Sequence, residues 1–160
     1  SIMHEIGSLE YTVERREQVR QLGKKFVLTN GSFDLIHAGH VHSLTQASKL
    51  GFLCVAVNSD SSIRKIKGAS RPIINEHYRL MTVNALKPVS NVFLFNTPRL
   101  HREIRLIKPD IYIKSTDYNM DTIDPQERDA LTQVGCEIKF IPLLYGLSTT
   151  SIIDKIKKYE

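Results

Sequence analysis

Short apolar runs alternate with stretches of helical spacing along this chain of 160 residues, and that alternation limits its fold more than any other feature. We expect strands at residues 26–28, 53–57, 91–95, 110–114 and 137–144. We expect helices at residues 9–22, 41–50, 76–86, 98–107, 122–134 and 149–158, and a loop at residues 61–72 that follows a short helix. Strands separated by helices of this length pair in parallel with right-handed crossovers. The sequence therefore predicts a Rossmann-like, three-layer α/β fold around a five-stranded parallel sheet.

One domain with a single core is expected, because 160 residues are too few for two ordinary domains. Residues 25–160 would form that domain. Residues 1–24 hold a helix that precedes the first strand, with Val13, Arg16 and Val19 on one face. We expect that face to pack against the domain or against a second copy, so the sequence leaves a homodimer open.

The charge balance and the cysteines narrow the class of partner and the compartment. The formal net charge is +5, but no aromatic residues interleave the basic cluster at residues 64–71, so we expect the phosphates of a small nucleotide rather than a nucleic acid. Cys54 and Cys136 lie in apolar runs, as buried reduced thiols do. No apolar run is long enough to span a bilayer and the first residues show no secretory pattern, so we expect no membrane partner and a cytoplasmic location.

Two histidines follow the turn between the first expected strand and the next helix. The apolar run at residues 26–28 ends in that turn, and helical spacing resumes at Val41. His37 and His40 stand three residues apart and share one face of the first helical turn, while Gly39 lets a ligand approach the backbone. Free N–H groups and the positive end of the helix dipole attract an anion there. The pair therefore indicates a phosphate site.

The ten residues 31–40, Gly-Ser-Phe-Asp-Leu-Ile-His-Ala-Gly-His, resemble the G-[ST]-F-D-x-x-H-x-G-H signature of the cytidylyltransferase-like nucleotidyltransferases. Seven positions are fixed in this window, so the signal is specific. The resemblance implies that His37 and His40 are catalytic and hold the α- and β-phosphates of a nucleoside triphosphate. The other residues that it would place at the nucleotide are Asn30, Gly31, Ser32, Phe33 and Gly39.

A second segment extends the resemblance. Residues 58–73 are similar to the N-S-D-x-S-x-x-x-x-K-G-x-x-R-P-[IV] run of the heptose-1-phosphate adenylyltransferases. The resemblance implies that Lys67 is catalytic and closes over the triphosphate or the sugar phosphate together with Arg71. Arg79 has the alternative of pairing with a nearby carboxylate. The candidates for contact with the substrate or the triphosphate are Asp34, Arg71, Arg79 and Lys114.

Two segments at expected strand ends match the same family. Residues 114–118 are similar to its Lys-Gly-Gly-Asp-Tyr motif, with Ser115 and Thr116 in place of the glycines. Residues 146–150 are similar to the Gly-x-Ser-Thr-Thr segment that closes its active site. These segments add four residues to the predicted nucleotide site, namely Asp117, Ser148, Thr149 and Thr150.

The resemblance implies an enzyme that transfers AMP from ATP to a sugar phosphate, most closely D-glycero-D-manno-heptose 1-phosphate of lipopolysaccharide core biosynthesis, giving ADP-heptose and pyrophosphate. The acceptor phosphate is already anionic at neutral pH, so alignment of two phosphates that repel each other is the catalytic task. Mg²⁺ is expected on the triphosphate, with no protein side chain as a metal ligand.

Other readings remain open from the sequence. Cytidylyltransferases that act on glycerol 3-phosphate, and adenylyltransferases that make FAD or coenzyme A precursors, carry the same signature. A non-catalytic nucleotide-binding module is an alternative of another class, favoured if Ser115 and Thr116 close the pocket. A nucleic-acid binder is a more distant one.

Overall fold

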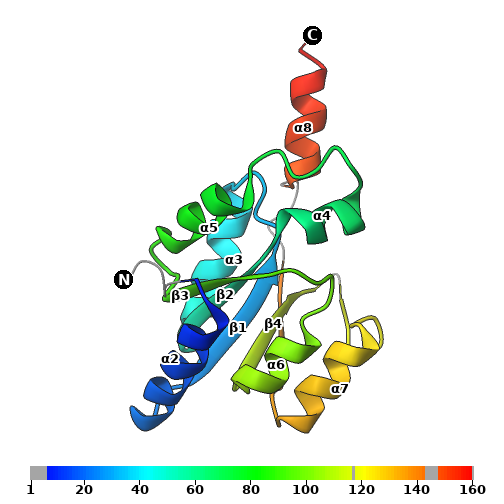
Figure 1. Cartoon of the computed structure of the whole chain (residues 1–160). Helices are drawn as coiled ribbons and strands as arrows, with labels where there is room; N and C mark the ends of the chain where they lie inside the picture. The colour runs from blue at the N-terminus through cyan, green and yellow to red at the C-terminus, as the bar shows by residue number, and fades with distance from the viewer. Residues whose placement is uncertain (1–6, 117, 143–147, 160) are drawn as a thin grey trace.

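A parallel sheet of five strands lies between two layers of helices in the computed structural model, which describes residues 7–116, 118–142 and 148–159 (Figure 1). The strands are β1 (Phe26–Gly31), β2 (Phe52–Asn58), β3 (Asn91–Phe95), β4 (Ile111–Ser115) and β5 (Glu137–Ile141). The helices are α2 (Leu9–Gln21), α3 (Ala38–Ser48), α4 (Asp60–Lys67), α5 (Glu76–Asn84), α6 (His101–Ile107), α7 (Pro125–Gln133) and α8 (Thr149–Lys157). The predicted α/β class and the five-stranded parallel sheet are confirmed. Residues 143–144, predicted as the end of the last strand, lie outside the described residues.

The strand order is β3-β2-β1-β4-β5, with β1 at the centre. The chain builds the sheet outward from β1 to β3 and then crosses back to place β4 on the other side of β1. The winding direction therefore reverses between β1 and β4. Parallel sheets of this kind bind ligands beyond the carboxyl ends of the strands at such a reversal.

Both faces of the sheet are buried. Phe26 and Leu28 of β1 pack with α2, α6 and α7 on one face, whereas Val27 packs with α3 and α5 on the other (Figure 1). Ile104 and Ile107 of α6 are buried against the first of these faces. Burial on both faces explains why the strands read as continuous apolar runs. Within the described part of the chain, no helix has the length and apolar character needed to cross a bilayer.

Helix α4 corrects the prediction of a loop at residues 61–72, because the helix occupies most of that stretch. The Oγ of Ser59 accepts a hydrogen bond from the N–H of Ser62 and caps the helix. Ile63 is buried and fixes the helix to the body of the protein. Gly68 ends the helix with a φ of 96°, a conformation that favours glycine. Arg64, Lys65 and Lys67 are therefore held on a helix rather than on a long loop, whereas Arg71 follows the helix.

Helices α6 and α7 each begin three residues later than predicted. The N–H of Leu100 donates to the Glu127 carboxylate at 2.9 Å, and α6 begins at the next residue, His101. The Asp124 side chain caps α7 and Pro125 follows as its first residue. A contact between the two helices thus sets one boundary, and local capping sets the other.

The face through which helix α2 packs on the sheet was predicted only in part, since Arg16 and Val19 are buried but Val13 is not. Val13 and Leu22 are 37% and 70% exposed, whereas Thr12 and Arg16 are buried beside Val19. Polar side chains take the inner positions because the strands offer them partners: Thr12 accepts a hydrogen bond from the side chain of Asn91 at 2.9 Å.

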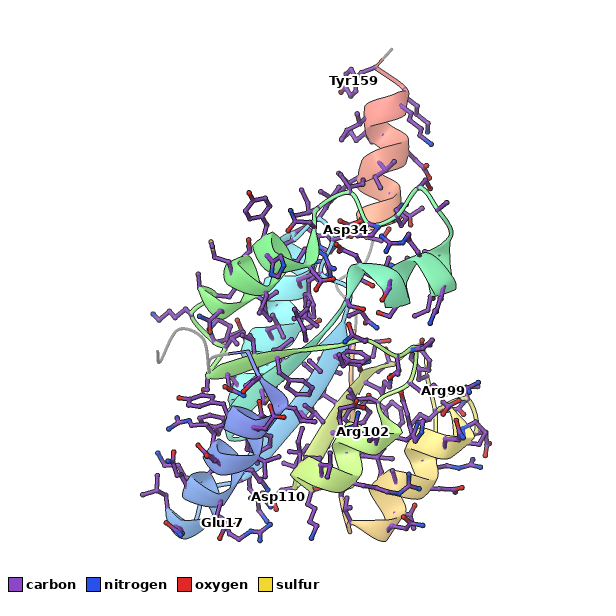
Figure 2. The ribbon with its side chains drawn as sticks, in the orientation of Figure 1. Glu17, Asp34, Arg99, Arg102, Asp110 and Tyr159 are labelled. Atoms are coloured by element: carbon purple, nitrogen blue, oxygen red, sulfur yellow. The ribbon has the colours of Figure 1, made fainter. Side chains whose placement is uncertain are left out.

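A buried ion pair ties α2 to the end of the sheet opposite Asp34 (Figure 2). The Arg16 guanidinium donates to Asp110 Oδ1 at 3.0 Å and to the Lys108 carbonyl at 2.8 Å. The other carboxylate oxygen of Asp110 accepts from the N–H of Phe26 at 2.8 Å. Asp110 therefore joins the helix, the first strand and the fourth strand.

Replacement of Asp110 by alanine is expected to lower the free energy of unfolding by about 3 kcal/mol, because a buried guanidinium loses its partner charge. Urea unfolding followed by circular dichroism measures the loss. As a control, Glu17→Ala breaks an exposed pair with Arg20 and should change the value by less than about 1 kcal/mol. Equal losses in the two variants would contradict the role of Asp110.

Candidate active site

A cleft of about 480 Å³ lies at the carboxyl ends of β1 and β4, where the strand order reverses. Its walls come from the end of β1, the turn and first helical turns of α3, the ends of α4 and β4, and the start of α8. Four segments that are far apart in the sequence therefore meet around one space. Each of them carries one of the four motif segments identified in the sequence.

Most of the predicted site residues line this cleft. They are His37, His40, Lys67, Asn30, Gly31, Ser32, Phe33, Gly39, Lys114, Ser148, Thr149 and Thr150. Asp34, Arg71 and Arg79 do not line it, and Asp117 lies outside the described residues. Ser43 lines the cleft but was missed, although it follows His40 by three residues and so shares its helix face.

The two histidines cap the N-terminus of α3 with their rings. Nδ1 of His37 accepts from the N–H of Gly39 at 3.0 Å, and Nδ1 of His40 accepts from the N–H of His37 at 3.2 Å. The ring centroids lie 4.0 Å apart. Because both Nδ1 atoms are acceptors, each neutral ring carries its proton on Nε2. Two N–H donors thus remain for a ligand in the cleft.

Burial keeps both rings neutral. It is the largest cause that lowers the pKa of His40 from 6.5 to about 4, and the charges of His37 and Lys67 add to it. Burial also lowers the pKa of His37. Neutral imidazoles are compatible with the capping bonds, since a protonated Nδ1 cannot accept a hydrogen bond.

Glycine is required at position 31 by a close contact within the turn. A Cβ on Gly31 would lie 2.9 Å from the ring of Phe33. Phe33 itself has a φ of 52°, and its ring packs 5.4 Å from the ring of His40. The turn therefore brings the Phe33 ring back against Gly31, and the same ring packs against the imidazole of His40.

Lys67 brings positive charge to the cleft from the last turn of α4. Burial and the neighbouring charge of Arg71 lower the pKa of Lys67, while Asp34 opposes them. Arg71 lies outside the lining but close enough to act on Lys67. This concentration of positive charge suits an anionic ligand.

Asp34 holds the segment that follows Arg71. Its two carboxylate oxygens accept hydrogen bonds from the N–H groups of Ile73 and Ile74 at 2.9–3.0 Å, and its side chain is buried. These contacts favour a structural role for Asp34 over the predicted contact with substrate.

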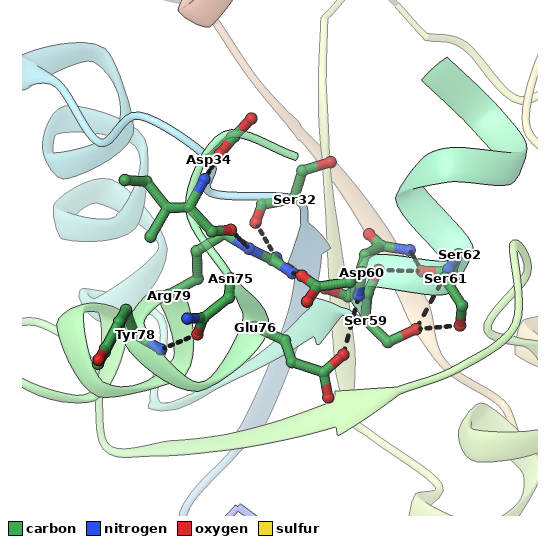
Figure 3. Close-up of polar contacts among 12 residues, drawn as sticks. Ser32, Asp34, Ser59, Asp60, Ser61, Ser62, Asn75, Glu76, Tyr78 and Arg79 are labelled. Carbon is green, nitrogen blue, oxygen red and sulfur yellow. Dashed lines mark hydrogen bonds and ion pairs between the residues drawn. The ribbon is translucent and has the colours of Figure 1, made fainter. Parts of the chain in front are cut away.

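Arg79 is 1% exposed and makes four internal hydrogen bonds (Figure 3). It donates to the carbonyls of Ser32, Asn58 and Ile74 at 2.6–2.8 Å and to the Asp60 carboxylate at 2.8 Å. Of the two readings made from the sequence, these contacts favour the ion pair over substrate binding. Arg79 joins the turn after β1 to the end of β2 and the start of α4.

The N-terminus of α8 closes another side of the cleft. The Oγ of Ser148 accepts from the N–H of Ser151 and caps the helix. The hydroxyl of Thr149 donates to the carbonyl of Leu35 at 3.3 Å, which fixes the start of α8 to the histidine-bearing turn. The rest of α8 extends away from the body of the protein, and none of its residues is buried (Figure 1).

The replacement of two glycines by Ser115 and Thr116 leaves the cleft open. Ser115 is one of its lining residues, and the N–H of Thr116 bonds to the carbonyl of Ile141 on β5. Lys114 also lines the cleft, with its Nζ 5.0 Å from the centre of the Tyr118 ring. The end of β4 thus presents a cation and an aromatic ring together.

Comparison with known proteins agrees with this geometry. The model of a protein family described as "Cytidylyltransferase-like" matches residues 28–155. The chain belongs to the cytidylyltransferase-like family. The resemblance recognised in residues 31–40 is thereby confirmed, and the chain is an enzyme of the nucleotidyltransferase class.

Two curated relatives that are similar in sequence to this cytidylyltransferase-like chain are each named bifunctional protein HldE. The one from Desulfatibacillum aliphaticivorans is 42% identical over 142 residues, and the one from Proteus mirabilis is 42% identical over 140 residues. These matches cover 88% and 87% of this chain and 29% of each relative. The chain therefore spans less than a third of the length of these relatives.

Two solved structures share the fold of this cytidylyltransferase-like chain. The lipopolysaccharide core biosynthesis protein from Thermoplasma volcanium GSS1 has a TM-score of 0.62 and 30% identity, covering 76% of this chain and 98% of its own. The pantoate-beta-alanine ligase from Francisella tularensis has a TM-score of 0.56 and covers 96% of this chain and 76% of its own. At 12% identity, the ligase shows the fold alone.

The donors in the cleft of this family member suit phosphate oxygens. They are imidazole and lysine nitrogens, amides and hydroxyls, and no carboxylate occurs among the described lining residues. Nor do three His, Cys, Asp or Glu side chains gather as a metal site anywhere in residues 7–116, 118–142 and 148–159.

The ligand-free protein is expected to lose stability as the pH falls from about 6.5 toward 4. In that window the unfolded chain binds a proton at position 40 that the folded ring, with its pKa of about 4, does not. The free energy of unfolding, measured in urea at several pH values, should therefore decrease on acidification. His40→Asn should flatten this dependence, because its side-chain oxygen replaces Nδ1 without titrating. An unchanged pH dependence in that variant would exclude His40 as the titrating group.

Proposed function

We propose that this chain transfers AMP from ATP onto the phosphate of a sugar, most closely D-glycero-D-manno-heptose 1-phosphate, releasing ADP-heptose and pyrophosphate. The observation that carries the proposal is the pair of imidazoles at the start of α3, whose Nδ1 atoms accept capping hydrogen bonds and whose Nε2 atoms have no hydrogen-bond partner among the described residues. The choice of a heptose rests on the relatives named HldE and on the lipopolysaccharide core biosynthesis protein.

In the proposed reaction, an anionic oxygen of the acceptor phosphate attacks the α-phosphorus of ATP. A bond forms between that oxygen and the phosphorus, and the bond from the phosphorus to the pyrophosphate oxygen breaks. No proton has to be removed from the nucleophile. The protein's task is to align the two phosphates and to stabilise the charge that develops on the leaving group.

The roles follow from the position of each group. His37 and His40 would donate from Nε2 to the α- and β-phosphate oxygens, beside the free N–H groups of the helix start. Lys67, with Arg71 behind it, would offset charge on the β- and γ-phosphates. Ser148 and Thr150 would bind the nucleotide from the α8 side. Mg²⁺ enters as part of the Mg·ATP substrate, held by phosphate oxygens and water.

Lys114 is the candidate for contact with the acceptor, because it brings a cation from β4 to the lining of the cleft. Asp117 stays a predicted nucleotide contact. The homodimer and the cytoplasmic location also stay predictions made from the sequence.

An assay of pyrophosphate release tests the proposal. ATP and CTP are offered in turn with heptose 1-phosphate, glycerol 3-phosphate, FMN and 4′-phosphopantetheine as acceptors. We expect turnover with ATP and heptose 1-phosphate and at least tenfold lower kcat/KM with any other pair. Preference for CTP and glycerol 3-phosphate would overturn the proposed substrates. Tight ATP binding without turnover for any acceptor would instead support a non-catalytic module.

His40→Ala is expected to lower kcat by about 10²-fold or more, because one donor to the transition state is lost. His40→Asn should do the same while keeping the capping acceptor for the N–H of His37, which separates catalysis from folding. Steady-state pyrophosphate release measures kcat, and thermal unfolding shows that each variant is folded.

His42→Asn is the matched control on the same helix, since His42 is exposed and does not line the cleft. Its kcat should equal that of the parent. A folded His40→Asn variant with the kcat of the parent would remove His40 from the mechanism.

A further inference from the structure

Tyr112 is a fully buried tyrosine on β4 whose hydroxyl reaches a residue of the cleft. It pairs with Leu28 of β1 in the sheet register, so its side chain lies on the same face as Leu28 and Asn30. Its Oη donates to Oδ1 of Asn30 at 2.8 Å. Asn30 lines the cleft, whereas Tyr112 does not.

The hydroxyl of Tyr112 is not needed for packing. The ring is 0% exposed among Phe26, Leu28 and the residues of α6 and α7, and a phenylalanine would fill the same space. A buried hydroxyl without a partner is unfavourable, so its presence is explained by the hydrogen bond that it makes. Burial raises the pKa of Tyr112 well above its ordinary value, which keeps the phenol protonated as a donor.

This hydrogen bond fixes which end of the Asn30 amide faces the ligand. If the amide turned over, the phenol would accept from Nδ2 and its own proton would lose its acceptor inside the core. With Oδ1 held by Tyr112, Nδ2 is the group left for the cleft. No residue in the described part of the chain accepts a hydrogen bond from that Nδ2.

The ring of Tyr112 also lies close to the side chain of Lys114. The Nζ of Lys114 lies 5.4 Å from the centre of the Tyr112 ring and 3.8 Å from the Glu127 carboxylate. One buried side chain thus contacts two polar residues of the cleft, one on each of the strands between which the winding reverses.

We propose that Tyr112 is a positioning residue that holds the Asn30 amide with its N–H donors toward the bound nucleotide. A nucleoside triphosphate presents phosphate and ribose oxygens that accept such hydrogen bonds, and a donor at position 30 favours them. The inference rests on the proposed function, because it takes a nucleotide to be the ligand beside Asn30.

A double-mutant cycle tests the inference by titration of Mg·ATP, without any need for turnover. Tyr112→Phe removes one oxygen atom, and we expect the Kd to rise about fivefold. Asn30→Ala should raise the Kd about tenfold, and the double variant should match Asn30→Ala rather than show the product of the two effects. Asn30→Asp keeps an acceptor for Tyr112 but replaces the donor with a negative charge, so it should bind more weakly than Asn30→Ala.

Tyr78→Phe is the matched control, because Tyr78 is exposed on α5 away from the cleft and should leave the Kd unchanged. If Tyr112→Phe lowers the melting temperature but keeps the Kd of the parent, Tyr112 is structural only and the inference is overturned. Multiplicative effects in the double variant overturn it as well.

The two proposals fail in different ways. A parent protein that binds Mg·ATP but turns over no acceptor removes the proposed function, while the cycle in Kd still decides the role of Tyr112. A parent protein that binds no nucleoside triphosphate overturns both.

Discussion

The buried guanidinium of Arg79 is the interaction on which the cleft depends. A charge removed from water must be matched by acceptors, and Arg79 finds them on the turn after β1, the end of β2, the segment before α5 and the start of α4. Asp34 adds a second connection, from that turn to Ile73 and Ile74. The walls that carry the histidines and Lys67 are therefore fixed to each other through buried polar contacts of Arg79 and Asp34, which do not line the cleft.

The capping bonds at the start of α3 also determine which nitrogen of each imidazole carries the proton. The rings of His37 and His40 stabilise the N-terminus of α3 by accepting hydrogen bonds from the N–H groups of Gly39 and His37. The same bonds leave the proton of each neutral ring on Nε2. The stability of the helix start and the proposed hydrogen bonds to phosphate thus depend on one tautomer. The lowered pKa values keep the rings neutral at neutral pH, and the capping bonds select the tautomer.

Much of the fold was predictable, because hydrophobic periodicity and capping residues are local signals. The histidine signature also supplied part of the cleft lining, namely Gly31, Ser32, Phe33, His37, Gly39 and His40. What the sequence did not reveal depends on contacts between distant residues: Arg79 lies 47 positions from Ser32, and Tyr112 lies 82 from Asn30. The inner face of α2 was predicted only in part for the same reason, since Thr12 accepts a hydrogen bond from Asn91, which lies 79 positions away on β3. Ser43, in contrast, could have been predicted as a lining residue, because it follows His40 by three residues and so shares its helix face.

Helix α8 contributes hydroxyls to the cleft but buries none of its residues, and the bond from Thr149 to Leu35 joins it to the histidine turn. A short helix with so little packing opens at a low free energy, so its backbone amides should exchange with solvent far sooner than those of the sheet. A ligand that bridges Ser148 and the imidazoles would protect those amides. Occupancy of the cleft would thereby be coupled to the order of α8.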